Sequence, residues 1–240
     1  MLDAIAFDAD DTLWHNMQLF ASTENRFKDL LAGYHEPSWI EKRLFETEMR
    51  NLEVFGYGIK GFTLSMIETA IDLSEGRISG REIQAILDLG RSMLAHPIEL
   101  FDHAEETVRL LSASHELILI TKGDLFDQES KLARSGLGDC FHHVEIVSRK
   151  DEETYRTILG KHSIHPDRFL MVGDSLKSDI LPVVALGAQA VHVPFEITWA
   201  HEEVPSDLLS RLYFHTIDHL GELPKIVSLI EGQLPAPEVV

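Results

Sequence analysis

Three aspartates crowd into four positions near the N-terminus, directly after an apolar run. The stretch AIAFDADDTLW, residues 4–14, contains Asp8, Asp10 and Asp11, and Thr12 follows at once. Like charges this close repel one another, and carboxylates that leave water carry a cost. Such a group needs a cation among its members unless some of them stay protonated. In this spacing one carboxylate can attack an electrophile while the other, two residues on, moves protons.

Polar residues follow three further apolar runs. They are Thr121, Lys122 and Gly123 after ELILIT, Arg149 and Lys150 after HVEIV, and Asp174 and Asp179 after RFLMVG. In an open α/β sheet, ligands bind beyond the carboxyl ends of the strands, so these groups would meet at one edge. Carboxylate oxygens suit Mg²⁺, whereas the hydroxyl of Thr121 and neighbouring backbone amides suit an anion. A phosphate beside Mg²⁺ would satisfy both kinds of group.

The elements that position these residues follow from hydrophobic patterning. Five apolar runs predict strands, at 4–8, 116–121, 143–147, 168–173 and 190–193. The nearly continuous apolar character of the first, second and fourth is typical of strands buried on both faces. Helix-length segments lie between the later strands, at 125–136, 151–162 and 178–187. Alternating strands and helices predict a doubly wound, parallel α/β sheet of about five main strands.

The interval 16–96 differs, because it contains helical patterns and no convincing strand. Helical spacing of apolar residues is evident at 61–73 and 79–96, and Ser79 and Glu82 have the spacing of a capping box. The interval is too long for a crossover loop. We therefore expect a core domain made of residues 1–15 and 97–240, with residues 16–96 inserted as a helical domain.

The amino-acid composition indicates which classes of binding partner are not expected. The 240 residues include 40 acids and 21 bases, which gives a formal net charge of -19. A surface this acidic repels nucleic acid backbones and anionic lipids. Neither is therefore expected as a partner. The single cysteine, Cys140, excludes an internal disulfide, and the N-terminus shows no basic and apolar leader. These features predict a cytoplasmic protein without a membrane span.

In this order, the motifs resemble those of the haloacid dehalogenase-like (HAD) hydrolase superfamily. FDADDTLW resembles the first motif, DxDx[TV] after a strand, and the IT at 120–121 resembles the second, an apolar strand that ends in Thr or Ser. Lys150, ahead of a helix that contains Tyr155, resembles the third, and VGDSLKSD resembles the acidic fourth. The resemblance implies a Rossmann-like core, and a helical cap between the first and second motifs is a familiar arrangement in this superfamily.

The resemblance implies roles for the acidic residues. Asp8 would be the nucleophile, with its other oxygen on Mg²⁺. Asp10 would be the general acid and base, and would lend its backbone carbonyl to the metal. Asp174 would be a metal ligand, and Asp179 either a ligand or a partner of one. Thr12 would orient the loop.

The resemblance also implies a phosphate site. Thr121 and the backbone amides of Lys122 and Gly123 would hold the phosphate, and Lys150 would stabilise both the nucleophile and the transferring phosphoryl group. Many relatives have Asn where Lys122 stands, so its side chain either adds positive charge near the substrate or faces solvent. Arg149, next to Lys150, is the alternative to that lysine.

The function expected is that of a Mg²⁺-dependent phosphatase that acts on a small phosphorylated metabolite through an aspartyl phosphate. Phosphomutase-type transfer uses the same aspartates and stays open as an alternative. Dehalogenases of the superfamily lack the second aspartate of the DxD pair, so Asp10 argues against that chemistry. A protein that only binds a phosphorylated ligand is disfavoured, because every catalytic position is filled. Asp11 stands where many relatives have Gly and is expected to be structural. Substrate identity and oligomeric state are not specified.

Overall fold

The chain divides into two compact units. The computed structural model describes residues 1–196, 199–202, 204–205 and 212–232. The first unit, here the core unit, comprises Met1–His15, Ile98–Thr121 and Lys131–Val240. The second, here the helical unit, comprises Asn16–Pro97 and Lys122–Ser130. The helical unit thus includes residues 122–130, which the sequence pattern assigns to the core.

A six-stranded sheet forms the centre of the core unit. Its strands are β1 (Ala4–Phe7), β2 (Glu116–Lys122), β3 (His143–Val147), β4 (Phe169–Gly173), β5 (Gln189–His192) and β6 (His215–Thr216). The strand order is β3-β2-β1-β4-β5-β6, and β1 pairs in parallel with both β2 and β4. The predicted parallel α/β fold and its five strands are confirmed. The sixth strand was not predicted, because two residues are too few to leave a periodic pattern.

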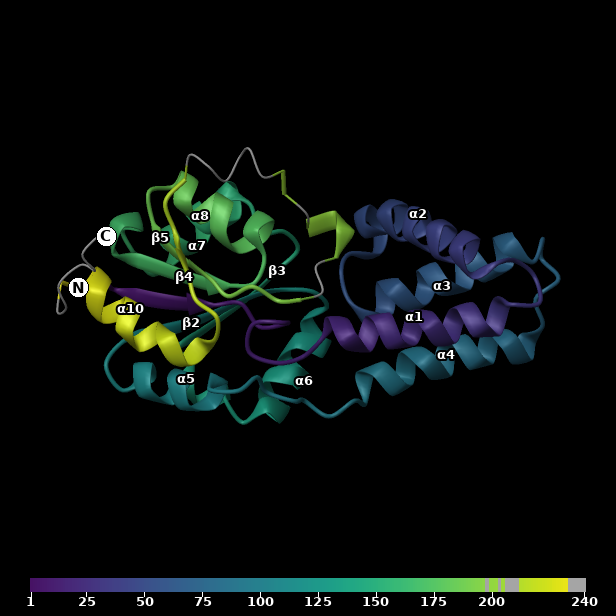
Figure 1. Cartoon of the computed structure of the whole chain (residues 1–240), viewed down its shortest axis with the longest axis horizontal. Helices are drawn as coiled ribbons and strands as arrows, with labels where there is room; N and C mark the ends of the chain where they lie inside the picture. The colour runs from purple at the N-terminus through teal and green to yellow at the C-terminus, as the bar shows by residue number, and fades with distance from the viewer. Residues whose placement is uncertain (197–198, 203, 206–211, 233–240) are drawn as a thin grey trace. The chain divides into compact units, whose positions relative to one another are not determined.

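The sheet is buried on both faces by helices. Alternate residues of β1 face opposite sides, so Ile5 and Phe7 lie in one hydrophobic cluster and Ala4 and Ala6 in another. The first cluster also contains residues of α5 (Ala104–Ser112) and α10 (Leu223–Ile230), which lie on the same side of the sheet in Figure 1. The second contains residues of α7 (Glu152–His162) and α8 (Leu181–Ala185).

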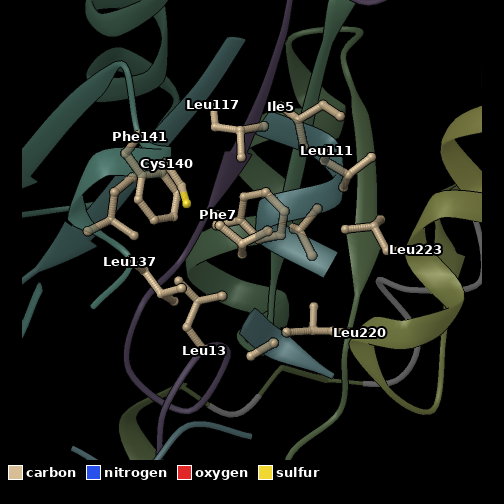
Figure 2. Packing of buried hydrophobic residues seen from close by; sticks show 14 of the residues in the cluster. Ile5, Phe7, Leu13, Leu111, Leu117, Leu137, Cys140, Phe141, Leu220 and Leu223 are labelled. Atoms are coloured by element: carbon tan, nitrogen blue, oxygen red, sulfur yellow. The ribbon is translucent and has the colours of Figure 1, made fainter. Parts of the chain in front are cut away.

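Phe7, the residue before Asp8, lies in the middle of the first cluster (Figure 2). Its ring meets that of Phe141 edge-on, with 6.2 Å between the ring centroids. On the other side of Phe7, Leu220 and Leu223 close the cluster. The strand end that carries Asp8 is therefore fixed by packing on the residue immediately before it.

The turns after β3 and β4 are closed by side-chain caps. Asp151 accepts a hydrogen bond from the backbone amide of Thr154 at 2.9 Å and so begins α7. After β4, the hydroxyl of Ser175 accepts from the amide of Ser178 at 3.1 Å. The helix predicted at 178–187 begins earlier, as a π-helical turn over Leu176–Ile180. It continues as α8, in which Pro182 is the second residue, and the carbonyl oxygen of Ser178 accepts a hydrogen bond from the Tyr155 hydroxyl at 3.0 Å. Short 3₁₀ segments connect other elements, namely Gly138–Cys140, Pro166–Arg168, Ala200–Glu202 and Leu220–Glu222.

The helical unit has a hydrophobic core of its own. Its helices are α1 (Met17–Leu31), α2 (Pro37–Phe55), α3 (Ile59–Leu73) and α4 (Gly80–Leu94), and the first turns of α6 (Leu125–Ser135) also belong to it. Buried residues of α1 to α4, among them Phe27, Ile40, Met66 and Ile86, form one cluster. The capping box predicted at the start of α4 is confirmed, because Ser79 and Glu82 each bond the other's backbone amide. Within the described part of the chain, every helix is too short or too polar to cross a membrane.

Helix α5 offers a matched test of the packing that supports the β1 edge. Leu111 is 4% exposed and belongs to the cluster around Phe7, whereas its neighbour Leu110 is 59% exposed. We expect Leu111→Ala to lower the free energy of unfolding by about 2–5 kcal/mol, because it leaves a cavity in the core. Leu110→Ala should change it by less than about 0.5 kcal/mol. Urea unfolding of both variants checks this, and equal effects would contradict the assignment.

Candidate active site

Two aspartates emerge side by side because their strands are parallel neighbours. In the register of β1 and β4, Phe7 lies opposite Val172, and the amide of Asp8 donates to the carbonyl oxygen of Val172 at 2.9 Å. Asp8 directly follows β1 and Asp174 directly follows β4, so both side chains leave the same edge of the sheet. This edge is the one that sequence patterning predicts for the site.

The ammonium group of Lys150 joins Asp8 to Asp179. Its Nζ donates to Oδ1 of Asp8 and, at 2.7 Å, to Oδ1 of Asp179. Burial disfavours the lysine's charge, but the attraction of Asp179 and Asp8 outweighs burial and holds the pKa of Lys150 well above its usual value. Arg149 is exposed, whereas Lys150 is buried. Lys150, and not Arg149, is therefore the cation that reaches the carboxylates.

Three carboxylates converge closely enough to share a metal ion. One oxygen each from Asp8, Asp174 and Asp179 lies within 4.8 Å of the others. Burial raises the pKa of Asp8 to about 7, against the attraction of Lys150, and the charge of Asp179 adds to the rise. Burial and the charges of Asp8 and Asp179 also raise the pKa of Asp174 well above its usual value. Because the carboxylates resist being charged together, a hard divalent cation with oxygen ligands fits this donor set.

Thr12 and Gly173 make this close approach possible. The hydroxyl of Thr12 lies 3.2 Å from Oδ2 of Asp8 and accepts a hydrogen bond from the amide of Asp174 at 3.0 Å. At Gly173, an added Cβ would lie 2.3 Å from Oδ2 of Asp179, so a larger residue would displace that carboxylate. The predicted supporting role of Thr12 has a geometric basis here. Gly173 was not singled out from the sequence, although a glycine at a buried strand end is a signal of close approach.

Asp10 lies outside this group of three side chains. Its Oδ1 accepts a hydrogen bond from the indole Nε1 of Trp14 at 2.7 Å. Nζ of Lys131 lies 3.0 Å from Oδ1 and 3.1 Å from Oδ2. Lys131 was missed by sequence reasoning, because a lysine on an amphipathic helix is normally a solvent-facing residue.

Residues after β2 are divided between the two units. Thr121 is buried in the core unit, two positions beyond Leu119, which pairs with Phe7 of β1. Lys122 and Gly123 belong to the helical unit, where Nζ of Lys122 lies 4.8 Å from the ring centroid of Tyr57. Of the two expectations for its side chain, neither included this aromatic contact. The phosphate-binding roles of these three residues stay predictions.

The loop after β5 supplies a further neighbour of the site. Oε2 of Glu202 accepts hydrogen bonds from the hydroxyl groups of Ser175 and Ser178, both at 2.6 Å. These serines lie in the turn that carries Asp174 and Asp179. Nothing in the residue pattern of this loop marks Glu202 as the contact.

With this geometry described, relatives can be compared. A model of haloacid dehalogenase-like hydrolases matches residues 2–187. The chain belongs to the haloacid dehalogenase-like hydrolases. A crystal structure of a family hydrolase from Xanthomonas campestris is 39% identical, with a TM-score of 0.85, and the match covers 97% of this chain and 93% of that one.

Two more distant haloacid dehalogenase-like proteins carry more specific names. The 5-amino-6-(5-phospho-D-ribitylamino)uracil phosphatase YigB of Escherichia coli (strain K12) is 23% identical over 235 residues, which cover 88% of this chain and 93% of that protein. A 2-haloacid dehalogenase from Pseudomonas syringae pv. tomato is 21% identical with a TM-score of 0.63, covering 95% of this chain and 99% of its own. The second likeness shows the fold alone. Membership of the family makes this protein an enzyme of the hydrolase class.

Asp11 shows why many haloacid dehalogenase-like hydrolases have glycine at this position. Its φ is 62°, in the left-handed region, and its amide donates to the carbonyl oxygen of Trp14 at 2.8 Å. Glycine adopts this conformation without strain, and Asp and Asn tolerate it better than other residues. Asp11 is therefore a turn residue at the point where the chain leaves β1.

Substitutions at Asp11 should follow backbone conformation. We expect Asp11→Asn and Asp11→Gly to keep the free energy of unfolding within about 0.5 kcal/mol of wild type, apart from charge effects that both share. Asp11→Val, which removes the same charge, should cost at least about 1–2 kcal/mol more than Asp11→Asn. Chemical denaturation measures the difference. Equal stability of the Val and Asn variants would show that the turn does not depend on a left-handed residue.

Proposed function

We propose that this protein is a Mg²⁺-dependent phosphatase that hydrolyses a small phosphorylated metabolite through an aspartyl phosphate. The observation that carries the proposal is the buried arrangement of Asp8 against Lys150, beside two further carboxylates. It supplies a nucleophile, a cation for the transferring group and a metal site in one place. The resemblance to YigB, which is a phosphatase, supports the same chemistry.

The metal would be held by Asp8, Asp174 and Asp179, with the backbone carbonyl of Asp10 as a further ligand. These oxygen donors suit Mg²⁺, which keeps part of its water shell and binds phosphate oxygens. When bound, Mg²⁺ supplies positive charge that offsets the negative charge of the carboxylates and the phosphoryl group. Lys150 adds a fixed positive charge at Oδ1 of Asp8.

The first step transfers the phosphoryl group to the enzyme. An oxygen of Asp8 attacks phosphorus and forms a bond to it, while the bond from phosphorus to the leaving oxygen breaks. That oxygen keeps the electron pair of the broken bond and takes a proton from the carboxyl group of Asp10. Lys150 offsets the charge that builds on the transferring group. Thr121 and the backbone amides of Lys122 and Gly123 would hold the remaining phosphate oxygens.

The second step returns the enzyme to its starting state. The carboxylate of Asp10 removes a proton from water, and the water oxygen attacks the phosphorus of the aspartyl phosphate. The bond between phosphorus and the Asp8 oxygen breaks, which releases Asp8 as a carboxylate and inorganic phosphate as the product. Asp10 is again protonated. Halide displacement needs no such proton donor, so Asp10 favours phosphate chemistry over dehalogenation.

Released phosphate across a panel of phosphorylated metabolites, together with p-nitrophenyl phosphate, tests this function. We expect Mg²⁺-dependent turnover that EDTA abolishes, and a loss of at least about 1,000-fold in kcat for Asp8→Asn, which removes the nucleophile. Asp88→Asn, at an exposed carboxylate on α4 that pairs with Arg91, is the matched control and should keep wild-type activity.

Three outcomes would contradict the proposal. Unchanged turnover in EDTA or in the Asp8→Asn protein would refute the mechanism. Chloride release from a 2-haloacid, without phosphate release from any ester, would indicate a dehalogenase. Binding of phosphorylated ligands with no turnover would indicate a binding protein. Product analysis also separates hydrolysis from transfer, because a phosphomutase would yield an isomeric phosphate ester instead of inorganic phosphate.

Mg²⁺ affinity should depend on pH in a defined direction. Without metal, the pKa of Asp8 is raised to about 7, so at pH 6 the carboxyl group is mostly protonated. Metal binding requires the carboxylate, so affinity should rise between pH 6 and pH 8 and binding should release protons. Isothermal titration calorimetry in buffers of different ionisation enthalpy measures both quantities. Asp8→Asn should bind more weakly and with a smaller pH dependence, and an affinity that falls with rising pH would contradict the assignment.

A further inference from the structure

Lys131 is a buried cation in the core unit that contacts the carboxyl group of Asp10. Its side chain is 7% exposed, and its Nζ lies almost equally far, 3.0 and 3.1 Å, from the two oxygens of Asp10. The two residues are 121 positions apart in the sequence. Burying an ammonium group costs several kcal/mol unless an opposite charge and hydrogen bonds compensate it. The carboxyl group of Asp10 supplies such an opposite charge, and the ion pair in turn fixes the orientation of Asp10.

Trp14 contacts the same carboxylate from another direction. Its indole Nε1 donates to Oδ1 of Asp10 at 2.7 Å, and its side chain is fully buried. The backbone of Trp14 is itself bridged to Leu100, with flanking hydrogen bonds from Phe101 to Leu13 and from His15 to Glu99. The carboxyl group of Asp10 is thus contacted both from helix α6 and from a fixed turn. Donors from two elements restrict its rotation about both side-chain torsions.

We propose that Lys131 is a positioning residue that orients the carboxyl group of Asp10 for proton transfer, with Trp14 as its second support. The proposal rests on the proposed phosphatase function, in which Asp10 protonates the leaving oxygen and later deprotonates water. Lys131 touches neither substrate nor reacting atoms in this scheme. In this scheme Lys131 transfers no proton, so the proton balance of the two steps is unchanged. It acts by keeping the Asp10 oxygens in one orientation, and small errors in such an orientation lower rates strongly.

A positioning role predicts a change in turnover instead of binding. General acid catalysis contributes roughly 100- to 10,000-fold, so poor orientation of Asp10 should forfeit part of that factor. We expect Lys131→Met, which keeps the length and apolar stem of the side chain, to lower kcat about 10- to 100-fold. KM should stay within about threefold of wild type, because Lys131 does not contact the substrate. Lys131→Arg, which keeps a cationic donor, should recover part of the loss.

The leaving group gives a readout that general destabilisation would not move. An alkyl phosphomonoester has a basic leaving oxygen that needs protonation, whereas p-nitrophenyl phosphate has a stable leaving anion that needs it less. Lys131→Met should therefore lower kcat/KM, which reports the first step, more for the best alkyl substrate found in the panel than for p-nitrophenyl phosphate. In an Asp10→Asn background, Lys131→Met should lower kcat less than about twofold further, since the residue acts through Asp10.

Lys161→Met is the matched control. Lys161 also pairs with a carboxylate, Glu145 at 2.6 Å, but its side chain is 59% exposed and is not part of the site. This variant should keep wild-type kcat with both substrates. If Lys131→Met does not fold, as judged by circular dichroism, Trp14→Phe tests the same idea. It removes the indole donor along with part of a buried ring system, and a folded variant should show the same dependence on the leaving group at smaller magnitude.

The outcomes separate this inference from the proposed function. If wild type releases phosphate, Asp8→Asn does not, and folded Lys131→Met matches wild type with both substrates, the positioning role is refuted while the phosphatase stands. Equal losses of kcat/KM with both substrates, or losses that multiply in full with those of Asp10→Asn, would also refute it. If wild type hydrolyses no phosphate ester, the proposed function itself fails.

Discussion

The ion pair of Lys150 with Asp8 and Asp179 is the interaction on which the rest of the site depends. Three carboxylates, two of them buried, have oxygen atoms within 4.8 Å of one another and would repel strongly without it. Even with this ammonium group present, the pKa of Asp8 rises to about 7, chiefly because the Asp8 carboxyl group is buried. The attraction of one lysine therefore offsets only part of the effect of burial. The remaining imbalance favours a further cation, so the metal and the nucleophile of the proposed mechanism can involve the same few atoms.

Packing of the surrounding core stabilises the fold and so compensates for the unfavourable gathering of carboxylates. The strands that carry Asp8 and Asp174 are buried along their whole length, and their parallel register places both carboxylates at one edge. Phe7 fixes the last residue of β1 in a cluster with helices on the same face. Gly173 leaves room for the carboxylate of Asp179, and Thr12 bridges the two strand ends. The stability of the hydrophobic clusters thus supports a site that is itself unfavourable.

The parts predictable from the sequence are those governed by local pattern. Apolar runs marked five strands, and the residues directly after them gave Asp8, Lys150, Asp174 and Asp179, which the structure brings together. Contacts that depend on tertiary placement were not predictable. Lys131 meets Asp10 across 121 residues, and Glu202 reaches Ser175 from a loop without a motif. The π-helical turn Leu176–Ile180, which contains Asp179, was also not predictable, because the spacing of apolar residues does not encode it. Residues 122–130 pack with the helical unit through contacts such as Lys60 with Asp124, which no linear pattern reveals.

Two buried lysines form ion pairs with different aspartates of the site. Lys150 holds Asp8 and Asp179, whereas Lys131 holds Asp10, only two residues from Asp8 in the chain. In the proposed mechanism these two aspartates have different tasks, since one attacks phosphorus and the other moves protons. A shared cation would draw both carboxylates to one point and favour the same geometry for both. Separate cations on different elements, one after β3 and one on α6, allow each carboxylate its own orientation. The crowding of the DxD segment is therefore resolved by direction as well as by charge, because the chain has left the strand after Phe7 and each of the two carboxylates meets its own lysine.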